Sequence, residues 1–146
     1  MIYRTLPVLL SLGMLAACAA TSRGPHVPDA PVQNTLWKLQ RLGGPTAPAP
    51  AVAARPAQFI LHLDDNRSSG TGGCNRFTGT YTLDGKTLRF GPQAATRMAC
   101  LDGMEHEQQF FDTLQRSAAW RIQGDHLWLL DASGKTLAEF DALYLR

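Results

Sequence analysis

A glycine-rich stretch with one cysteine holds the residue types that could do chemistry. Residues 70–81 read GTGGCNRFTGTY, with four glycines around Cys74. A phosphate-binding loop of this kind needs a lysine and a hydroxyl after its last glycine, or a GxGxxG pattern between a strand and a helix. Neither pattern is present, and a strand is expected to follow. The glycines therefore favour tight turns and close approach of neighbouring backbones.

Cys74 could also be a nucleophile, which requires a histidine base nearby. His62, His106 and His126 are available in the sequence, but no local signature pairs any of them with the cysteine. Two other interpretations stay open, namely a disulfide with Cys100 and a free buried thiol.

Metal binding has weak support. His62 and Asp64 are two residues apart, and Asp102, Glu105 and His106 lie close together in the sequence. Neither set has the spacing of a zinc site or of an EF-hand loop. We therefore expect no metal and no cofactor, and interpret these side chains as exposed polar residues.

The first residues have the pattern of a secretion signal. Arg4 precedes an apolar run over residues 6–17, which is too short to span a membrane. The run ends in Leu-Ala-Ala before Cys18 and resembles a bacterial lipobox, which predicts an acylated Cys18 as the attachment to the membrane. An ordinary cleaved signal and an uncleaved anchor are the alternatives. The residue after Cys18 is Ala19 rather than an aspartate, and in this the sequence resembles lipoproteins that are sorted to the outer membrane of Gram-negative bacteria. We expect the domain to face the periplasm.

The charge of the chain bears on its partner, and its cysteines bear on its stability. The chain has 14 basic and 12 acidic residues, and no basic stripe that would predict a nucleic-acid partner. In an oxidising compartment, Cys74 and Cys100 are more often a disulfide than two free thiols. Closing a loop of this length contributes about 3 to 4 kcal/mol to the free energy of unfolding on the chain-entropy model.

The sequence predicts three segments. Residues 1–17 form the lipoprotein signal peptide, residues 18–33 a flexible tether, and residues 34–146 one folded domain. A proline- and alanine-rich surface loop is expected at 45–57 inside that domain, because its prolines oppose a central strand or helix.

The domain is expected to be mainly β (α+β). Asp84-Gly85 and Gly124-Asp125 are hairpin turn signals. Asp102 is the expected cap of an amphipathic helix over residues 103–116, and no βαβ alternation is present. These features predict a small antiparallel, curled or barrel-like sheet with one helix packed on it. The expected strands are 35–40, 59–63, 76–83, 86–90, 120–123, 126–130 and 136–141.

Most of the aromatic side chains on these strands should fill the interior of the curled sheet. An interior that is not completely filled could instead accept an acyl chain or a small apolar ligand. The aromatic residues concerned are Trp37, Phe59, Phe77, Tyr81, Phe90, Trp120, Trp128 and Phe140.

A series of spaced motifs occurs in order along the domain. It includes the strand pattern at Trp37 and Leu39, the Asp84-Gly85 turn, and Glu107 in the helix. The other motif residues are Gly73, Cys74, Asn75, Phe77, Gly79, Tyr81, Thr96, Arg97, Met98 and Cys100. Over residues 34–143, this series resembles the META domain of the HslJ type.

This resemblance implies a barrel-like antiparallel β domain in the cell envelope, often a lipoprotein, associated with heat shock, other stress and antibiotic tolerance. It gives no catalytic residue, and it places the two motif cysteines at Cys74 and Cys100. We therefore expect a non-enzymatic envelope lipoprotein that acts by binding a lipid or an envelope protein. The alternatives are a lipid or small apolar ligand carrier, a secretion-pilot-like assembly factor and, last, a cysteine-dependent enzyme.

Overall fold

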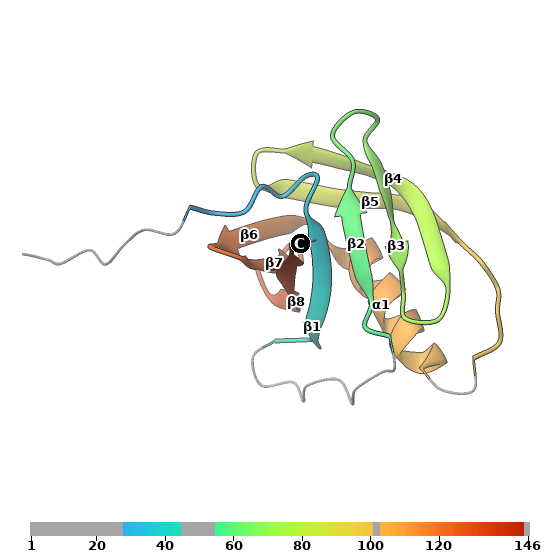
Figure 1. Cartoon of the computed structure of the whole chain (residues 1–146). Coiled ribbons are helices and arrows are strands. Elements are labelled where there is room, and N and C mark those ends of the chain that lie inside the picture. Colours follow the sequence, from blue (N-terminus) through green and yellow to red (C-terminus); the bar gives the residue numbers. More distant parts are fainter. Residues whose placement is uncertain (1–27, 45–54, 101–102, 145–146) are drawn as a thin grey trace, which may run out of the picture.

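The computed structural model of the chain describes residues 28–44, 55–100 and 103–144. The predicted signal peptide, Cys18 and most of the predicted loop at 45–57 lie outside these residues. Eight strands and one helix follow one another (Figure 1): β1 (Leu36–Leu42), β2 (Gln58–Leu61), β3 (Arg67–Thr71), β4 (Arg76–Asp84), β5 (Thr87–Ala95), α1 (Met104–Arg116), β6 (Ala119–Gln123), β7 (His126–Leu130) and β8 (Thr136–Leu143).

The strands form one antiparallel sheet that closes into a ring. Each strand pairs with the next along the chain, and β8 returns to pair with β1, for example at Leu39 and Phe140. The contact between β5 and β6 is the exception, because it consists of a single pair, Thr87 with Ala119. The ring is therefore closed but is not a continuous barrel. The predicted curled, barrel-like antiparallel sheet with one packed helix is confirmed.

Helix α1 lies in the connection between the two weakly paired strands and packs on the sheet (Figure 1). It buries Phe110 and Leu114 completely, as its amphipathic pattern predicts. The predicted cap was wrong by one residue. Gly103 is the N-cap, with φ of 94° and no side-chain cap hydrogen bond, whereas Asp102 lies outside the described residues. No helix in the described part of the chain is long and apolar enough to cross a membrane.

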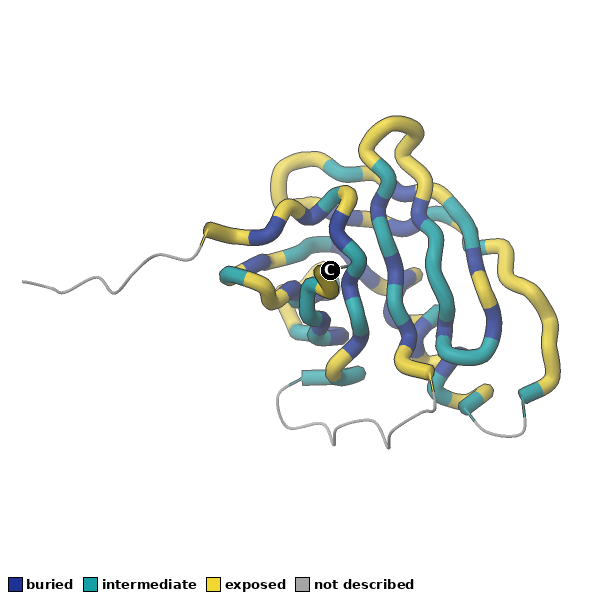
Figure 2. Tube along the Cα trace, viewed as in Figure 1, coloured by how far each residue is buried: buried dark blue, intermediate teal, exposed yellow. Residues whose placement is uncertain are grey.

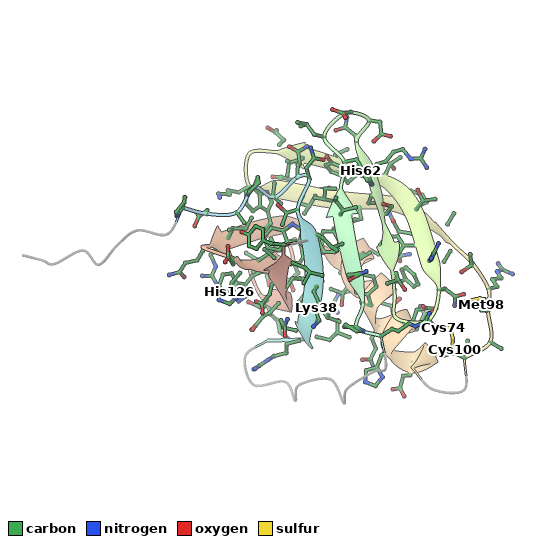
Figure 3. The ribbon with its side chains drawn as sticks, in the orientation of Figure 1. Lys38, His62, Cys74, Met98, Cys100 and His126 are labelled. Carbon is green, nitrogen blue, oxygen red and sulfur yellow. A yellow bond between two sulfur atoms is a disulfide. The ribbon has the colours of Figure 1, made fainter. Side chains whose placement is uncertain are left out.

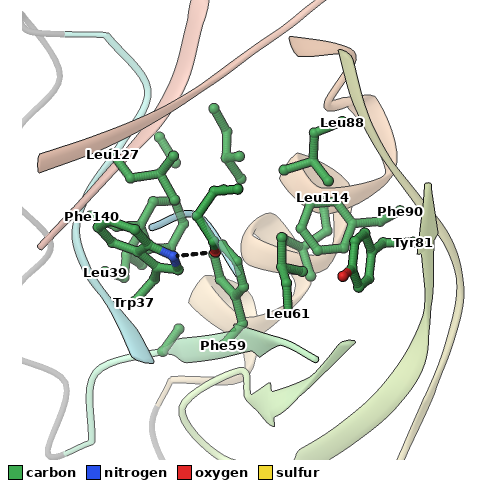
Figure 4. Close-up of a cluster of buried hydrophobic side chains, with 14 of the residues drawn as sticks. Trp37, Leu39, Phe59, Leu61, Tyr81, Leu88, Phe90, Leu114, Leu127 and Phe140 are labelled. Atoms are coloured by element: carbon green, nitrogen blue, oxygen red, sulfur yellow. Dashed lines mark hydrogen bonds between the residues drawn. The ribbon is translucent and has the colours of Figure 1, made fainter. Parts of the chain in front are cut away.

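The interior of the ring contains a connected apolar core (Figures 2 and 4). The ring of Phe59 packs edge-on against Phe90 and Phe140, with centroids 5.5 and 5.0 Å apart. Six of the eight strand aromatics are buried as predicted. The exceptions are Trp120 and Trp128, which are half-buried.

The folded domain begins before residue 34. Ala30 and Val32 are buried in the core, although the sequence assigned them to the tether. The backbone amide of Ala30 donates to the carbonyl of Gly124 at 2.9 Å, and the indole of Trp37 donates to the carbonyl of Val32 at 2.9 Å. These contacts attach the segment at 30–33 to the ring.

The largest differences from the predicted strands concern β3 and β5. Strand β3 was not predicted, because its sequence RSSGT lacks the alternating apolar pattern of a strand. Its Ser68 points inward and donates to the side-chain oxygen of Gln93 at 2.9 Å. Strand β5 continues to Ala95, past the predicted end at Phe90.

Candidate functional site

Three segments that are distant in the sequence meet around Asn75: the turn at 72–75, the segment at 96–100 and helix α1. Asn75 and Glu107 lie at the centre of this meeting point, and only 4 % and 7 % of their surfaces are exposed. We call Asn75, Thr96, Glu107 and the Cys74–Cys100 disulfide the Asn75 cluster.

The carboxylate of Glu107 binds the turn from the helix side. Its Oε2 accepts hydrogen bonds from the backbone amides of Asn75, at 2.6 Å, and Cys74, at 3.1 Å. Its Oε1 accepts from the side-chain amide of Asn75 at 2.7 Å. Three N–H donors thus compensate for the burial of this charged group.

The other end of the Asn75 amide binds the segment after β5. Its Oδ1 accepts from the backbone amide of Met98 at 2.7 Å and from the hydroxyl of Thr96 at 2.9 Å. Among the described residues, every fully buried side-chain nitrogen or oxygen has a hydrogen-bond partner. Asn75 therefore connects the helix, the turn and the segment after β5 by both ends of one side chain.

The disulfide makes the same connection covalently. Cys74 and Cys100 are bonded, with their Cα atoms 6.2 Å apart, which confirms the predicted bridge (Figure 3). The bond joins the turn at 72–75 to the segment at 96–100, beside the hydrogen bonds of Asn75.

Two glycines of the turn explain part of the glycine-rich sequence. A Cβ atom on Gly72 would lie 2.7 Å from Cγ of Glu107, so a side chain there would displace the carboxylate. Gly73 has φ of 115°, which L side chains rarely adopt. In the structure these glycines permit the turn that presents the amides of Cys74 and Asn75.

The remaining strand motif residues lie along β4. Phe77 is buried and packs edge-on against Phe111 of the helix, with centroids 5.4 Å apart. Gly79 leaves space for the side chain of Gln93, which a Cβ atom would approach to 2.4 Å. Tyr81 is buried, and its hydroxyl donates to the carbonyl of His62 at 2.8 Å. These three residues are parts of the core and of the sheet.

Next to the Asn75 cluster, a groove of about 470 Å³ separates the end of β5 from α1. The residues at 93–97 form its strand side. Its helix side is formed by Met104, Glu107, Gln108 and Phe111. The groove thus shares Thr96 and Glu107 with the cluster and contains Arg97 of the family motif.

Two methionines are exposed beside this groove. Met104 lines it, and Met98 directly follows Arg97. Both side chains are more than half exposed, at 54 % and 55 %. Methionine is among the more buried residue types, and exposed methionines are characteristic of adaptable binding surfaces. They add apolar contact area to a groove that is lined by both polar and apolar side chains.

Two of the histidines make hydrogen bonds with residues other than Cys74. Nε2 of His62 lies 2.7 Å from the hydroxyl of Ser69, and Nδ1 of His126 lies 2.6 Å from the carboxylate of Asp141. The sulfur of Cys74 is bonded to that of Cys100. No group of three or more His, Cys, Asp or Glu side chains that could hold a metal occurs in the described ranges.

The motif in the sequence contains the residues of the Asn75 cluster but does not predict their contacts. It includes Glu107 without giving that residue a role. The contact of Glu107 with Asn75 crosses 32 positions in the chain, and no local pattern signals it. The signal in the sequence is a glutamate on the otherwise apolar face of the helix, because charged residues are rarely buried without partners.

The fold and the cluster define a class of small β protein: a closed ring of antiparallel strands with one packed helix, in which a buried Asn–Glu pair and a disulfide join the helix to the strands. The chain belongs to the META domain family, whose model matches residues 30–143. None of the curated proteins matches the chain.

Solved structures share the fold. A protein from Burkholderia xenovorans, determined by NMR, is 28 % identical, with a TM-score of 0.65; the match covers 78 % of this chain and 85 % of that one. A second NMR structure is 22 % identical over 75 % of this chain and 90 % of the other, with a TM-score of 0.57. A crystal structure of a duf4847 family protein from Bacteroides vulgatus is 14 % identical over 79 % and 96 % of the two chains, with a TM-score of 0.58.

Proposed function

We propose that this chain is a non-enzymatic envelope lipoprotein that binds a protein partner through the groove between β5 and α1. The observation that carries the proposal is the position of the motif residues. Thr96, Arg97 and Met98 are exposed at or beside the groove, although Asn75 and the disulfide hold the same segment firmly. A surface that is both exposed and rigid loses little conformational entropy when it binds.

The core supports an outer surface as the binding site. Side chains from the strands and from α1 meet inside the ring, where Phe110 lies against Phe77 and Phe140. A lipid carrier needs interior space, and this packing favours a partner that docks outside.

The proposed location follows from Cys18. Acyl chains on this cysteine would hold the protein at the outer membrane, with the domain in the periplasm, and would leave the folded surface free for a partner. Its expression would rise under heat or antibiotic stress, as the resemblance implies. The nearly balanced charge, with a net of +2, favours neither nucleic acid nor another strongly charged partner.

Site-specific photocrosslinking in bacterial cells tests the proposal. A photoreactive amino acid replaces Gln108 in the groove of the full-length chain or, as a control, Lys38 on β1 outside the groove. We expect a discrete crosslinked protein from position 108 and none from position 38. Equal crosslinking from both positions, or none from position 108, would contradict a binding role for the groove.

A native mass spectrum of residues 19–146, exported to an oxidising compartment, separates this proposal from a lipid carrier. A mass equal to the oxidised polypeptide alone supports an outer binding surface. A retained apolar adduct would contradict it and redirect attention to the interior of the ring.

A further inference from the structure

We propose that the groove takes an extended peptide, which adds as a strand to the free edge of β5 and carries a carboxylate at the Arg97 end. This inference rests on the proposed function and names the chemistry of the partner. It comes from the pairing of β5, which is complete on one side and nearly absent on the other.

The two edges of β5 differ in their pairing. On one side the strand pairs with β4 from Thr87 to Ala95. On the other side, pairing with β6 is limited to Thr87. Beyond that position, no strand in the described part of the chain covers this edge. The last two residues of β5 and the residues after it, 94–99, are exposed (Figure 2).

The hydrogen bonds show which backbone groups face the groove. The amide of Thr96 donates to the carbonyl of Arg76, so Thr96 bonds towards β4. Neighbouring residues of an antiparallel strand point to opposite edges. The amides and carbonyls of Ala95 and Gln93 therefore point away from β4, to the side on which α1 lies.

This edge suits a peptide backbone. A free strand edge presents alternating donors and acceptors, which an extended peptide satisfies by adding one strand. The helix wall opposite, with Met104 and Phe111, offers apolar contact to one row of the peptide's side chains. A groove between a strand and a helix admits a single chain more readily than the sheet of a second folded domain.

Charge gives the peptide a polarity. Among the described residues, Arg97 and Glu107 are the charged ones that line the groove. The carboxylate of Glu107 already accepts three hydrogen bonds, whereas Arg97 is exposed and makes no ion pair with a described residue. Arg97 therefore places a positive charge at the end of the β5 edge. An Asp or Glu side chain of the peptide would complement it.

The test uses a phage-displayed library of linear peptides, selected on residues 19–146 with the disulfide intact. Synthetic copies of the recovered peptides are then measured by calorimetry. Ala95→Pro removes the outward amide without removing a hydrogen bond to β4 and should weaken binding about tenfold. Ala95→Val keeps the amide and is the matched control, with less than a twofold change. Arg97→Gln should weaken binding two- to fivefold, and replacing the peptide's acidic residue by its amide should have no further effect in that variant.

Amide hydrogen exchange of the wild-type protein gives a readout that needs no variant. The bound peptide should protect the amides of Gln93 and Ala95 and leave those of β7 unchanged. Failure to select any peptide, binding that Ala95→Pro does not weaken, or protection elsewhere would overturn the inference. Crosslinking at position 108 together with such a result would preserve the groove as a binding site and reject only its extended-peptide ligand.

Discussion

Asn75 contacts its neighbours with both ends of its amide, and the two ends cannot be exchanged. Its Nδ2 faces a carboxylate oxygen of Glu107, and its Oδ1 faces two donors, at Thr96 and Met98. Aspartate has nearly the same shape but has no donor. The cluster therefore requires the amide and excludes its nearest isostere.

Asn75→Asp should be more destabilising than Asn75→Ala at pH 7. Aspartate would place two carboxylates in contact where the native distance is 2.7 Å, at a cost of about 3 to 5 kcal/mol in the free energy of unfolding. Urea unfolding of the two variants at pH 7 measures the difference. An Asn75→Asp variant that is no less stable than Asn75→Ala would contradict the proposed contact.

Asp131 gives a second prediction at this scale. The carboxylate of Asp131 accepts a hydrogen bond from the hydroxyl of Ser133, at 2.6 Å, and another from the backbone amide of Lys135, at 3.0 Å. These two bonds lower the pKa of Asp131 below its ordinary value. A lowered pKa in the folded state stabilises the protein above the unfolded-state pKa, and this contribution is lost as the pH falls through the folded value.

Ser133→Ala should raise the pKa of Asp131 towards its ordinary value, because it removes the largest cause of the shift. An NMR titration of the side-chain carboxyl measures the change, with Ser69→Ala as the control. A pKa that stays at its wild-type value in Ser133→Ala would show that the hydroxyl does not contribute.

At the scale of the element, β3 depends on a glycine. Gly70 pairs with Phe59 of β2 and with Phe77 of β4. A Cβ atom there would lie 2.0 Å from the backbone oxygen of Gln58 and 2.8 Å from Cα of Phe59. The strand fits between its neighbours because this residue has no side chain.

Gly70→Ala should therefore lower the free energy of unfolding by about 2 to 3 kcal/mol, because the backbone of β2 must move. Gly44→Ala is the control, since a Cβ atom there meets nothing within 4 Å, and it should change stability by less than about 0.5 kcal/mol. Chemical denaturation of the two variants compares them. Similar stabilities would contradict close packing at Gly70.

The sequence predicted the elements that carry local signals. The turns at Asp84-Gly85 and Gly124-Asp125 and the apolar stripe of α1 are such signals, and the corresponding hairpins and helix are present. Strand β3 carries none, because its buried residue is Ser68, which becomes acceptable only beside Gln93. The cap at Gly103 was missed because its left-handed backbone, rather than a side chain, defines it.

The whole molecule adds information that no single element contains. The disulfide could be predicted from the cysteine count and the expected compartment. The groove could not, because its two walls become neighbours only when the ring closes at Thr87 and Ala119 and α1 takes the place beside the end of β5.

The same closure should be the least stable part of the ring. The single strand pair, Thr87 with Ala119, is held by two backbone hydrogen bonds, from the amide of Leu88 to the carbonyl of Ala118 and from the amide of Trp120 to the carbonyl of Lys86. We expect the amides of Leu88 and Trp120 to exchange with deuterium faster than that of Phe140, whose strand pairs on both sides. Exchange measured by NMR tests this order. Equal protection of all three amides would indicate that the ring opens as one unit.

The hydrogen bond from Ala30 to Gly124 fixes the place at which the N-terminal segment joins the ring. The chain from Cys18 joins the ring at the β6–β7 turn, and Cys74 and Met98 lie on the opposite side (Figures 1 and 3). Ala30 lies twelve positions after Cys18, so even a fully extended connection would place that turn within about 40 Å of an acyl anchor. An acyl anchor at Cys18 would then keep the β6–β7 end of the ring within this distance of the bilayer, whereas Cys74 and Met98, beside the groove, lie on the side away from the point of attachment (Figure 3).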